Sequence, residues 1–123
     1  MNRTIMAVAI GIAAVGGGAV SLPGAQAALS QCAADHACGW INENFVGLSV
    51  SRDATTPKSL SRLPDNDAIT AIANKGSRAV GWYTDISMDG RRYCETPGDS
   101  NPNVGDSWND RFSSLAVYST RHC

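Results

Sequence analysis

The chain has 123 residues, of which 43% are hydrophobic and 17% charged, with a formal net charge of −1 at pH 7. This near-neutral balance, without a cluster of basic residues, argues against a nucleic-acid partner. The length suits one small domain behind an N-terminal targeting segment.

Residues 1–27 have the order of a secretory signal peptide. Arg3 precedes an uncharged run from Ile5 to Val20, followed by a helix-breaking LPG and the small-residue sequence AQA. The alternative, an uncleaved membrane anchor, fits less well because the run is rich in Gly and Ala and marginal in length for a bilayer. We therefore expect a secreted, extracellular protein that leaves the membrane after cleavage. Its single domain would comprise residues 28–123, with nine cations against 11 anions.

The segment WINENFVG, residues 40–47, lacks the alternation of a plain strand. Trp40 is followed five residues later by Phe45, and Gly47 comes two residues after that. In a folded hairpin the two aromatic rings lie on opposite arms and pack, which contributes about 0.5–1.5 kcal/mol beyond their buried area. The glycine permits backbone conformations that other residues resist. The pattern predicts a tight hairpin, called a corner below.

The corner pattern recurs 43 residues later as YTDISMDG, residues 83–90, with Met88 in place of Phe45. A second pair of motifs has the same offset, since NDAITAI begins at Asn66 and NDRFSSL at Asn109. Two separate matches at one offset indicate an internal duplication. We predict a first motif of about residues 37–76 and a second of about residues 77–119.

Each repeat carries short segments with the alternation of β-strands, and Pro, Gly, Asn and Asp crowd the intervals between them. A repeat of about four strands cannot close a core alone and is expected to pair with its copy. The sequence therefore predicts an all-β domain of two packed sheets. The expected strands are residues 46–52, 68–74, 77–85 and 112–118.

Four cysteines allow three disulfide connectivities in an exported domain. We favour Cys32–Cys38, which closes a short loop beside the first corner, and Cys94–Cys123, which ties down the chain end and contributes roughly 3 kcal/mol. The alternative is a zinc site built from CAADHAC and the terminal HC. It is disfavoured because exported thiols oxidise and the spacing matches no common zinc finger.

The two corners and the two Asn-Asp boxes resemble the signature of the βγ-crystallin superfamily. The sequence is most similar there to secreted bacterial proteins grouped with the microbial metalloproteinase inhibitors, which also carry a cysteine pair before the first corner and a G-x-x-x-C and a PG after the second. The corresponding residues are Cys32, Cys38, Gly90, Cys94, Pro97 and Gly98, and the likeness covers residues 32–119. It implies two Greek-key motifs forming one disulfide-stapled βγ-crystallin-type sandwich, expected as a monomer.

The resemblance also implies calcium, up to two ions, bound at the boxes. Each box offers a carboxylate and, three residues later, a hydroxyl, and calcium prefers such oxygen ligands together with backbone carbonyls. Asn66 and Asn109 are expected to orient the loops. The implied ligands are the side chains of Asp67, Asp110, Thr70 and Ser113 and the carbonyls of Ala68, Arg111, Glu43 and Ile86.

The first box departs from the pattern. Ala71 stands where the second box has Ser114, so the second box is the closer match. The alternative for both boxes is a capped turn without metal, because Asn, Asp, Ser and Thr side chains bond their own backbone in turns.

Two functions compete. The first is a non-enzymatic, calcium-stabilised domain, and the second is inhibition of a secreted metallopeptidase through a loop at residues 94–106. Against the second, Cys94 has no nearby cysteine to stiffen that loop. An enzyme is disfavoured because the two histidines lie at the extremities of the domain. Three aromatic residues are expected to serve packing rather than ligand binding: Trp82, Tyr83 and Trp108.

Overall fold

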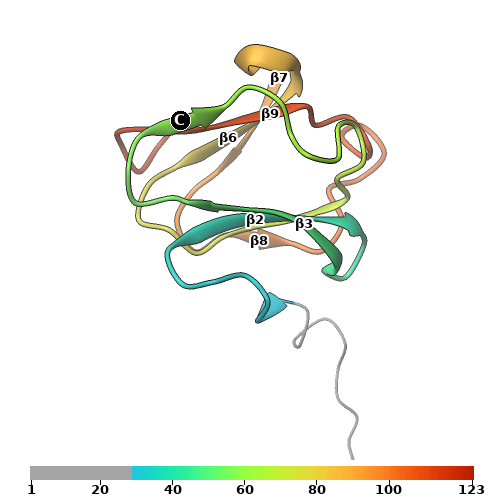
Figure 1. Ribbon diagram of the computed structural model, residues 1–123, viewed down its shortest axis with the longest axis horizontal. Coiled ribbons are helices and arrows are strands. Elements are labelled where there is room, and N and C mark those ends of the chain that lie inside the picture. The colour runs from blue at the N-terminus through green and yellow to red at the C-terminus, as the bar shows by residue number, and fades with distance from the viewer. Residues whose placement is uncertain (1–28) are drawn as a thin grey trace, which may run out of the picture.

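The computed structural model describes residues 29–123, so the predicted signal peptide lies outside the described residues. Two four-stranded antiparallel sheets pack face to face (Figure 1). The first sheet has the order β3 (Val46–Asp53), β2 (His36–Asn42), β5 (Ala71–Asn74) and β8 (Ser100–Asn101). The second has the order β4 (Lys58–Leu60), β9 (Ser114–Val117), β6 (Val80–Asp85) and β7 (Asp89–Glu95), with a 3-10 turn, η2 (Ile86–Met88), between β6 and β7. Within residues 29–123 there is no helix of the length and apolarity needed to cross a membrane.

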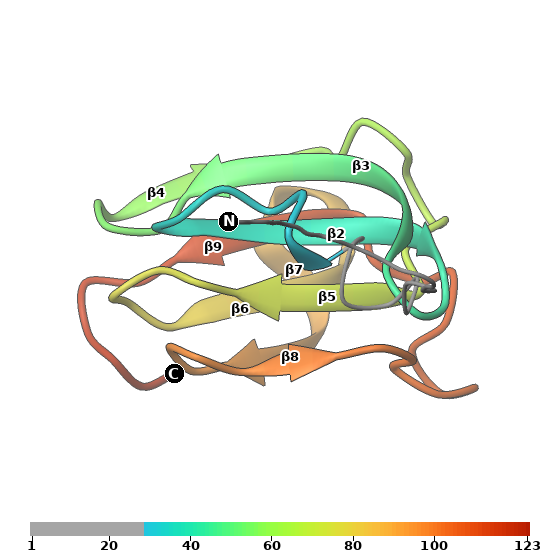
Figure 2. The same ribbon diagram turned by 90° about the horizontal axis from the view of Figure 1, so that it is seen from below.

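Each motif gives its third strand to the sheet of the other motif. Strand β4 pairs with β9, and β8 pairs with β5, so the first sheet is completed by the second motif and the second sheet by the first (Figure 2). The predicted sandwich of two Greek-key motifs is confirmed. This exchange explains why neither repeat can complete its own sheet.

The expected strands at residues 46–52 and 77–85 correspond to β3 and β6. Strand β6 begins three residues later than predicted, at Val80, and the other two expected strands also begin late, β5 at Ala71 and β9 at Ser114. The residues before β5 and β9 form the box turns, where Asp67 and Asp110 have left-handed φ angles of 60° and 56°. The alternation pattern did not single out β2, β4, β7 or β8.

The main core lies between the sheets and contains the fully buried Trp82, Phe112 and Ile72. The prediction that Trp82 serves core packing is therefore confirmed. Trp108 is partly buried, and its ring lies 5.9 Å from that of Phe112. Tyr83 is half-buried on the opposite face of its strand, because successive side chains of a strand point to opposite faces.

A second, smaller core covers the outer face of the first sheet. We call it the satellite core, and the N-terminal segment packs onto it through Leu29. The Trp40 indole donates a hydrogen bond from Nε1 to Gln31 Oε1 at 3.3 Å. Six residues form the satellite core: Cys32, Cys38, Trp40, Phe45, Ala71 and Ala73.

Both favoured disulfides are present, Cys32–Cys38 and Cys94–Cys123, and no cysteine of residues 29–123 is free. The zinc alternative is therefore wrong for these residues, because no thiolate is left to bind a metal. Each bond ties one end of the described chain to the sheet of the nearer motif.

Candidate metal sites

The two corners have the same backbone conformation. In the first, Asn44, Phe45 and Gly47 have φ angles of 59°, 60° and 79°. The positions 43 residues later have φ angles of 59°, 57° and 78°. In the first corner the rings of Trp40 and Phe45 meet edge to face, 4.9 Å between centroids. The predicted aromatic packing is confirmed there, and Gly47 and Gly90 do supply the left-handed backbone.

The two boxes contact each other across the molecule. The Asp67 amide donates to the Phe112 carbonyl at 2.9 Å, and the Asp110 amide donates to the Ile69 carbonyl at 3.1 Å. The Ser113 hydroxyl therefore reaches Asp67 Oδ1 of the other motif at 2.8 Å. These contacts bring oxygen atoms of both motifs together.

Two surface clefts border the boxes and are related by the repeat. Ile41, Asn42 and Ala68 line the first cleft, and the second is lined at the positions 43 residues later. Asp67 and Asp110 line both. The first cleft has a volume of about 530 Å³ and is lined by Ile41, Asn42, Glu43, Asp67, Ala68, Thr70, Asn103, Asp106, Asn109 and Asp110. The second has a volume of about 320 Å³ and is lined by Asp67, Thr84, Asp85, Arg91, Asp110 and Arg111.

The implied ligands divide unevenly between the clefts. The first cleft gathers Glu43, Ala68 and Thr70, with Asp67 and Asp110 at its border. The second is lined by Arg111, but Ile86 does not line it and is 44% exposed. Thr84 and Asp85, the equivalents of Ile41 and Asn42, are the residues of the second corner that line it. Beside this cleft, the Ser113 hydroxyl also lies 3.0 Å from the Thr84 carbonyl oxygen.

The two clefts differ in the charged residues that line them. Four carboxylates line the first, and none of the described residues that line it is a lysine or arginine. The second has three carboxylates but also the guanidinium groups of Arg91 and Arg111. The positive charges of these two guanidinium groups repel a cation that approaches the cleft. The second cleft is therefore the poorer cation site, although its box matches the sequence pattern more closely.

The last position of the second box, Ser114, stabilises its corner and does not line a cleft. The Ser114 hydroxyl donates to the Asp85 carbonyl at 2.6 Å and accepts a hydrogen bond from the Met88 amide at 2.9 Å. Ala71 cannot make these bonds in the first motif. The alanine therefore deprives the first corner of these two hydrogen bonds, but it does not remove an oxygen atom that would line the cleft.

Four residues of the first cleft were not singled out as site residues in the sequence: Ile41, Asn42, Asn103 and Asp106. Asn103 and Asp106 come from the long connection between β8 and β9, and Asn103 Nδ2 donates to Glu43 Oε1 at 3.1 Å. They belong to neither box, so the repeat gives no signal for them. The offset of 43 applied to Ile41 and Asn42 would have identified Thr84 and Asp85.

In residues 29–123, no three His, Cys, Asp or Glu side chains gather closely enough to form a metal centre by themselves. A calcium ion at these clefts would depend on mixed ligands, including hydroxyls, carboxamides and backbone carbonyls. In the first cleft the Thr70 hydroxyl already lies 2.6 Å from Asn109 Oδ1, a pair of oxygens drawn from both motifs. The donor set is one that calcium accepts.

Residues 25–95 match the model of peptidase inhibitor family I36. The chain belongs to this family. The matched span includes the whole first motif and the second corner. No match was found among curated proteins.

Solved βγ-crystallin domains share the fold. A domain from Clostridium beijerinckii is 25% identical, with a TM-score of 0.56, over 69% of this chain and 99% of that one. A βγ-crystallin from Ciona intestinalis is 26% identical, with a TM-score of 0.56, over 68% and 99%. A structure from work on the evolution of the eye-lens domain fold has a TM-score of 0.59 at 16% identity, over 70% and 87%. This member of family I36 therefore has a βγ-crystallin fold.

Proposed function

We propose that this family I36 protein is a secreted, non-enzymatic domain that binds calcium between its two Asn-Asp boxes and is stabilised by the ion. The observation that carries the proposal is the first cleft, where carboxylates and carboxamides of both motifs meet the Thr70 hydroxyl. An ion bound there would connect the two motifs and oppose their separation on unfolding.

The first cleft is the tighter of up to two sites in this proposal. Glu43, Asp67, Asp106 and Asp110 line it without a counter-charge from its described lining residues. An extracellular calcium module of this kind has a dissociation constant on the order of 10⁻⁴–10⁻³ M. Occupancy by calcium would also hold Asn103 and Asp106, and so would steady the connection that carries them.

Calcium is expected to raise the melting temperature of the oxidised domain. At free calcium about 100-fold above the dissociation constant, linkage adds roughly 2.7 kcal/mol to the unfolding free energy, which corresponds to roughly 11–22 °C in a domain of this size. Differential scanning fluorimetry with calcium and then with a chelator measures the shift. A melting temperature that calcium does not change would contradict the proposal.

Two matched substitutions distinguish the clefts. Asp106 lines only the first cleft and Asp85 only the second. Asp106→Asn is expected to weaken calcium binding about tenfold, the scale of one lost ionic ligand, whereas Asp85→Asn leaves the tighter site unchanged. Calorimetric titration gives both affinities. Equal effects of the two substitutions would refute the assignment to the first cleft.

Inhibition of a secreted metallopeptidase is the second candidate, supported by the family and by the bonding of the connection after β7. The Thr96 amide and hydroxyl donate to Asp99 Oδ2 at 2.9 and 2.8 Å. The Gly98 amide donates to the Asn74 carbonyl at 2.8 Å, and the Val104 amide to the Thr70 carbonyl at 2.9 Å. These bonds preorganise the loop, a role that a local disulfide would otherwise have, and preorganisation lowers the cost of binding.

Titration against a thermolysin-like metallopeptidase tests this candidate. The intact domain is expected to inhibit at micromolar concentration or below. Asp99→Ala removes the two bonds from Thr96, so the loosened loop is expected to be cleaved instead. Asp65→Ala, which removes a hydrogen bond to Ser49 on the other side of the domain, is the control. Absence of inhibition by the unmodified domain would count against the candidate.

A further inference from the structure

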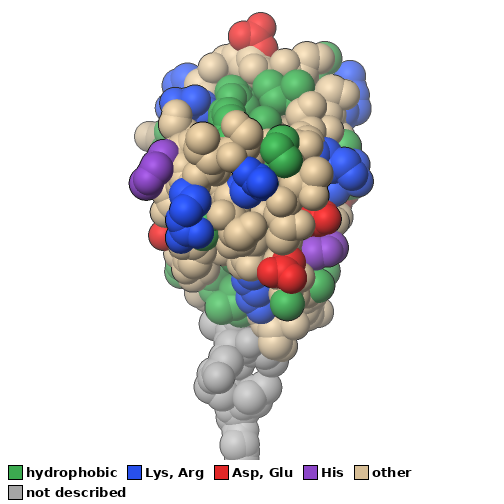
Figure 3. All heavy atoms as spheres, turned by 90° about the vertical axis from the view of Figure 1, so that its left-hand side faces the viewer, with side chains coloured by type: hydrophobic (Ala, Val, Ile, Leu, Met, Phe, Trp, Pro, Cys, Tyr) green, Lys and Arg blue, Asp and Glu red, His purple; other side chains and the backbone are tan. Residues whose placement is uncertain are grey.

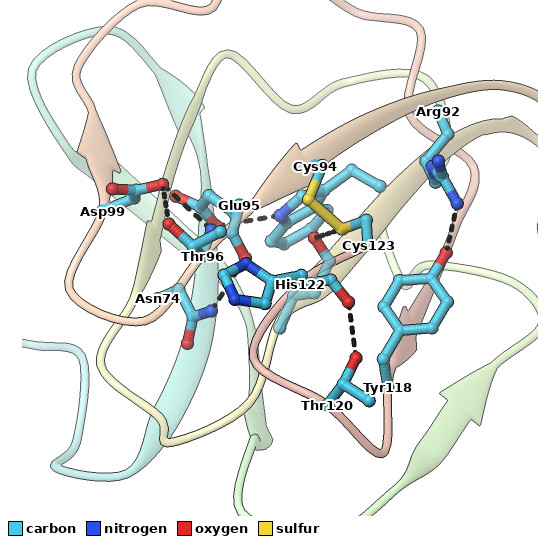
Figure 4. The surroundings of a disulfide bond; sticks show 12 residues. Asn74, Arg92, Cys94, Glu95, Thr96, Asp99, Tyr118, Thr120, His122 and Cys123 are labelled. Carbon is cyan, nitrogen blue, oxygen red and sulfur yellow. Dashed lines mark hydrogen bonds between the residues drawn. A yellow bond between two sulfur atoms is a disulfide. The ribbon is translucent and has the colours of Figure 1, made fainter.

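The outer face of the second sheet carries an aromatic and cationic surface that neither proposed function uses. We call it the sheet-two face, and it consists of Gly81, Tyr83, Arg92, Ala116 and Tyr118. Tyr118 lies across Gly81, where an added Cβ would come within 2.6 Å of the Tyr118 hydroxyl. That hydroxyl is hydrogen-bonded to the hydroxyl of Tyr83. Figure 4 shows Arg92 above Tyr118, beside the Cys94–Cys123 disulfide.

The repeat relates this surface to one that is already covered. Trp40, Cys38 and Ala73 in the satellite core lie 43 residues before Tyr83, Gly81 and Ala116. The three satellite-core residues are at most 1% exposed under the N-terminal segment. Tyr83 and Ala116 are only half-buried, whereas Gly81 is covered by Tyr118. The sheet-two face is thus the open counterpart of a surface that a polypeptide segment covers in the first motif.

The covering segment also indicates the chemistry of an occupant. In the first motif, the corner aromatic Trp40 donates its indole hydrogen bond to the side-chain oxygen of Gln31. At the equivalent place, Tyr83 presents a hydroxyl whose pKa is raised, mainly by burial and then by the bond to Tyr118, so it stays protonated as a donor. An oxygen atom that accepts a hydrogen bond therefore suits the place next to Tyr83, as the side-chain oxygen of Gln31 suits the place next to Trp40.

Arg92 adds a positive charge to this position. Its guanidinium lies 5.9 Å from the ring centroid of Tyr118 and bonds the Tyr118 hydroxyl at 3.4 Å. The pKa of Arg92 is raised by these tyrosine contacts, and no carboxylate is among the causes. A guanidinium has five N–H donors, so most of its bonding capacity is available. Figure 3 shows further Lys and Arg side chains, with Asp and Glu side chains among them, at the end of the sandwich that carries the C-terminus.

We propose that the sheet-two face binds an acidic polypeptide segment, with a Glu or Asp carboxylate accepting hydrogen bonds from Arg92 and from the one tyrosine hydroxyl proton that the Tyr83–Tyr118 bond leaves available. The segment would lie beside Tyr118 and over Ala116, as the N-terminal segment lies over Ala73 in the first motif. Arg and Tyr are enriched among the residues that dominate protein interfaces. A bidentate bond from Arg92 would also select a carboxylate by its shape.

The test is a titration of the ¹⁵N-labelled, oxidised domain with poly-L-glutamate at low ionic strength. EDTA is present throughout, because the polymer itself binds calcium. Saturable amide shifts are expected at Tyr83, Arg92 and Ala116, and poly-L-lysine should produce none. Arg92→Gln is expected to weaken binding about tenfold, as the loss of a charge-assisted hydrogen bond implies. Arg92→Lys should fall between, because lysine keeps the charge but not the planar fork.

Arg62→Gln is the matched control, since it removes an equal charge from an exposed position between β4 and β5. An effect of this control as large as that of Arg92→Gln would show general charge attraction and overturn the proposal. Shifts centred away from the sheet-two face, or no saturable binding, would overturn it as well. Heparin is the third arm, and tighter binding of heparin than of poly-L-glutamate would assign the face to a sulfated polysaccharide instead.

Discussion

Replacing Glu95 by glutamine is expected to remove most of the change in unfolding free energy that occurs between about pH 4.5 and about pH 8. Glu95 is 1% exposed, and burial raises its pKa from 4.5 to about 8. A hydrogen bond from Trp82 Nε1 to Glu95 Oε1, 3.0 Å long, acts in the opposite direction, and nearby Asp99 raises the pKa further. The other carboxyl oxygen, Oε2, has no hydrogen-bond partner in residues 29–123.

The sign follows from proton linkage. Between about pH 4.5 and about pH 8 the folded domain keeps a proton on Glu95 that the unfolded chain releases, so raising the pH favours unfolding. The contribution is complete below the unfolded pKa and is lost as the pH rises to the folded pKa. The difference between the two values corresponds to a loss of up to roughly 5 kcal/mol. Most domains have a total stability of only about 5–15 kcal/mol, so the effect is large.

Glutamine mimics the protonated acid. Its carbonyl oxygen can accept the Trp82 bond, and it carries no charge at any pH. Urea unfolding near pH 5 and near pH 9 should show a strong decline for the unmodified domain and a much weaker one for Glu95→Gln. Glu43→Gln, at the other, exposed glutamate of the chain, is the control and should keep the decline. An equal decline in all three proteins would show that Glu95 is not the responsible group.

Most of this fold can be predicted from the sequence because the repeat identifies the residues that occupy equivalent positions in the two motifs. The offset of 43 predicts that Asn44 and Ser87, or Asp67 and Asp110, occupy equivalent backbone positions, and their φ angles agree closely. The exchange of β4 and β8 between the sheets is not visible in the same way. Those strands have three and two residues, too short for alternation to be recognised, and their partners are distant in the sequence.

The candidate sites are less predictable than the fold. The Asn-Asp boxes locate both clefts, but their charge depends on residues outside the boxes. Arg91 enters the second cleft from β7, and Asp106 enters the first from a long connection. Glu95 gives no signal at all, because a glutamate before Thr-Pro-Gly has the composition of an exposed turn. Its burial arises only when β7 turns that face toward Trp82.

Replacing Trp40 by alanine is expected to cost about 3–5 kcal/mol of unfolding free energy, whereas Tyr83→Ala at the equivalent place in the second motif should cost roughly 1 kcal/mol. Trp40 is fully buried, packs against Phe45 and bonds Gln31. Its loss leaves a cavity beneath the N-terminal segment. Tyr83 is half-buried on an open face, so solvent can fill the space that its ring leaves.

Urea unfolding of the oxidised variants measures the difference, with both disulfides retained so that chain entropy is unchanged. Adding Leu29→Ala to each variant identifies the cause. Leu29 packs against the satellite core, so its loss should be non-additive with Trp40→Ala and additive with Tyr83→Ala. Equal losses of unfolding free energy for Trp40→Ala and Tyr83→Ala would mean that the N-terminal segment does not make the first corner more stable than the second. Unequal costs with the predicted coupling would show that one duplicated corner became a core and the other remained a surface.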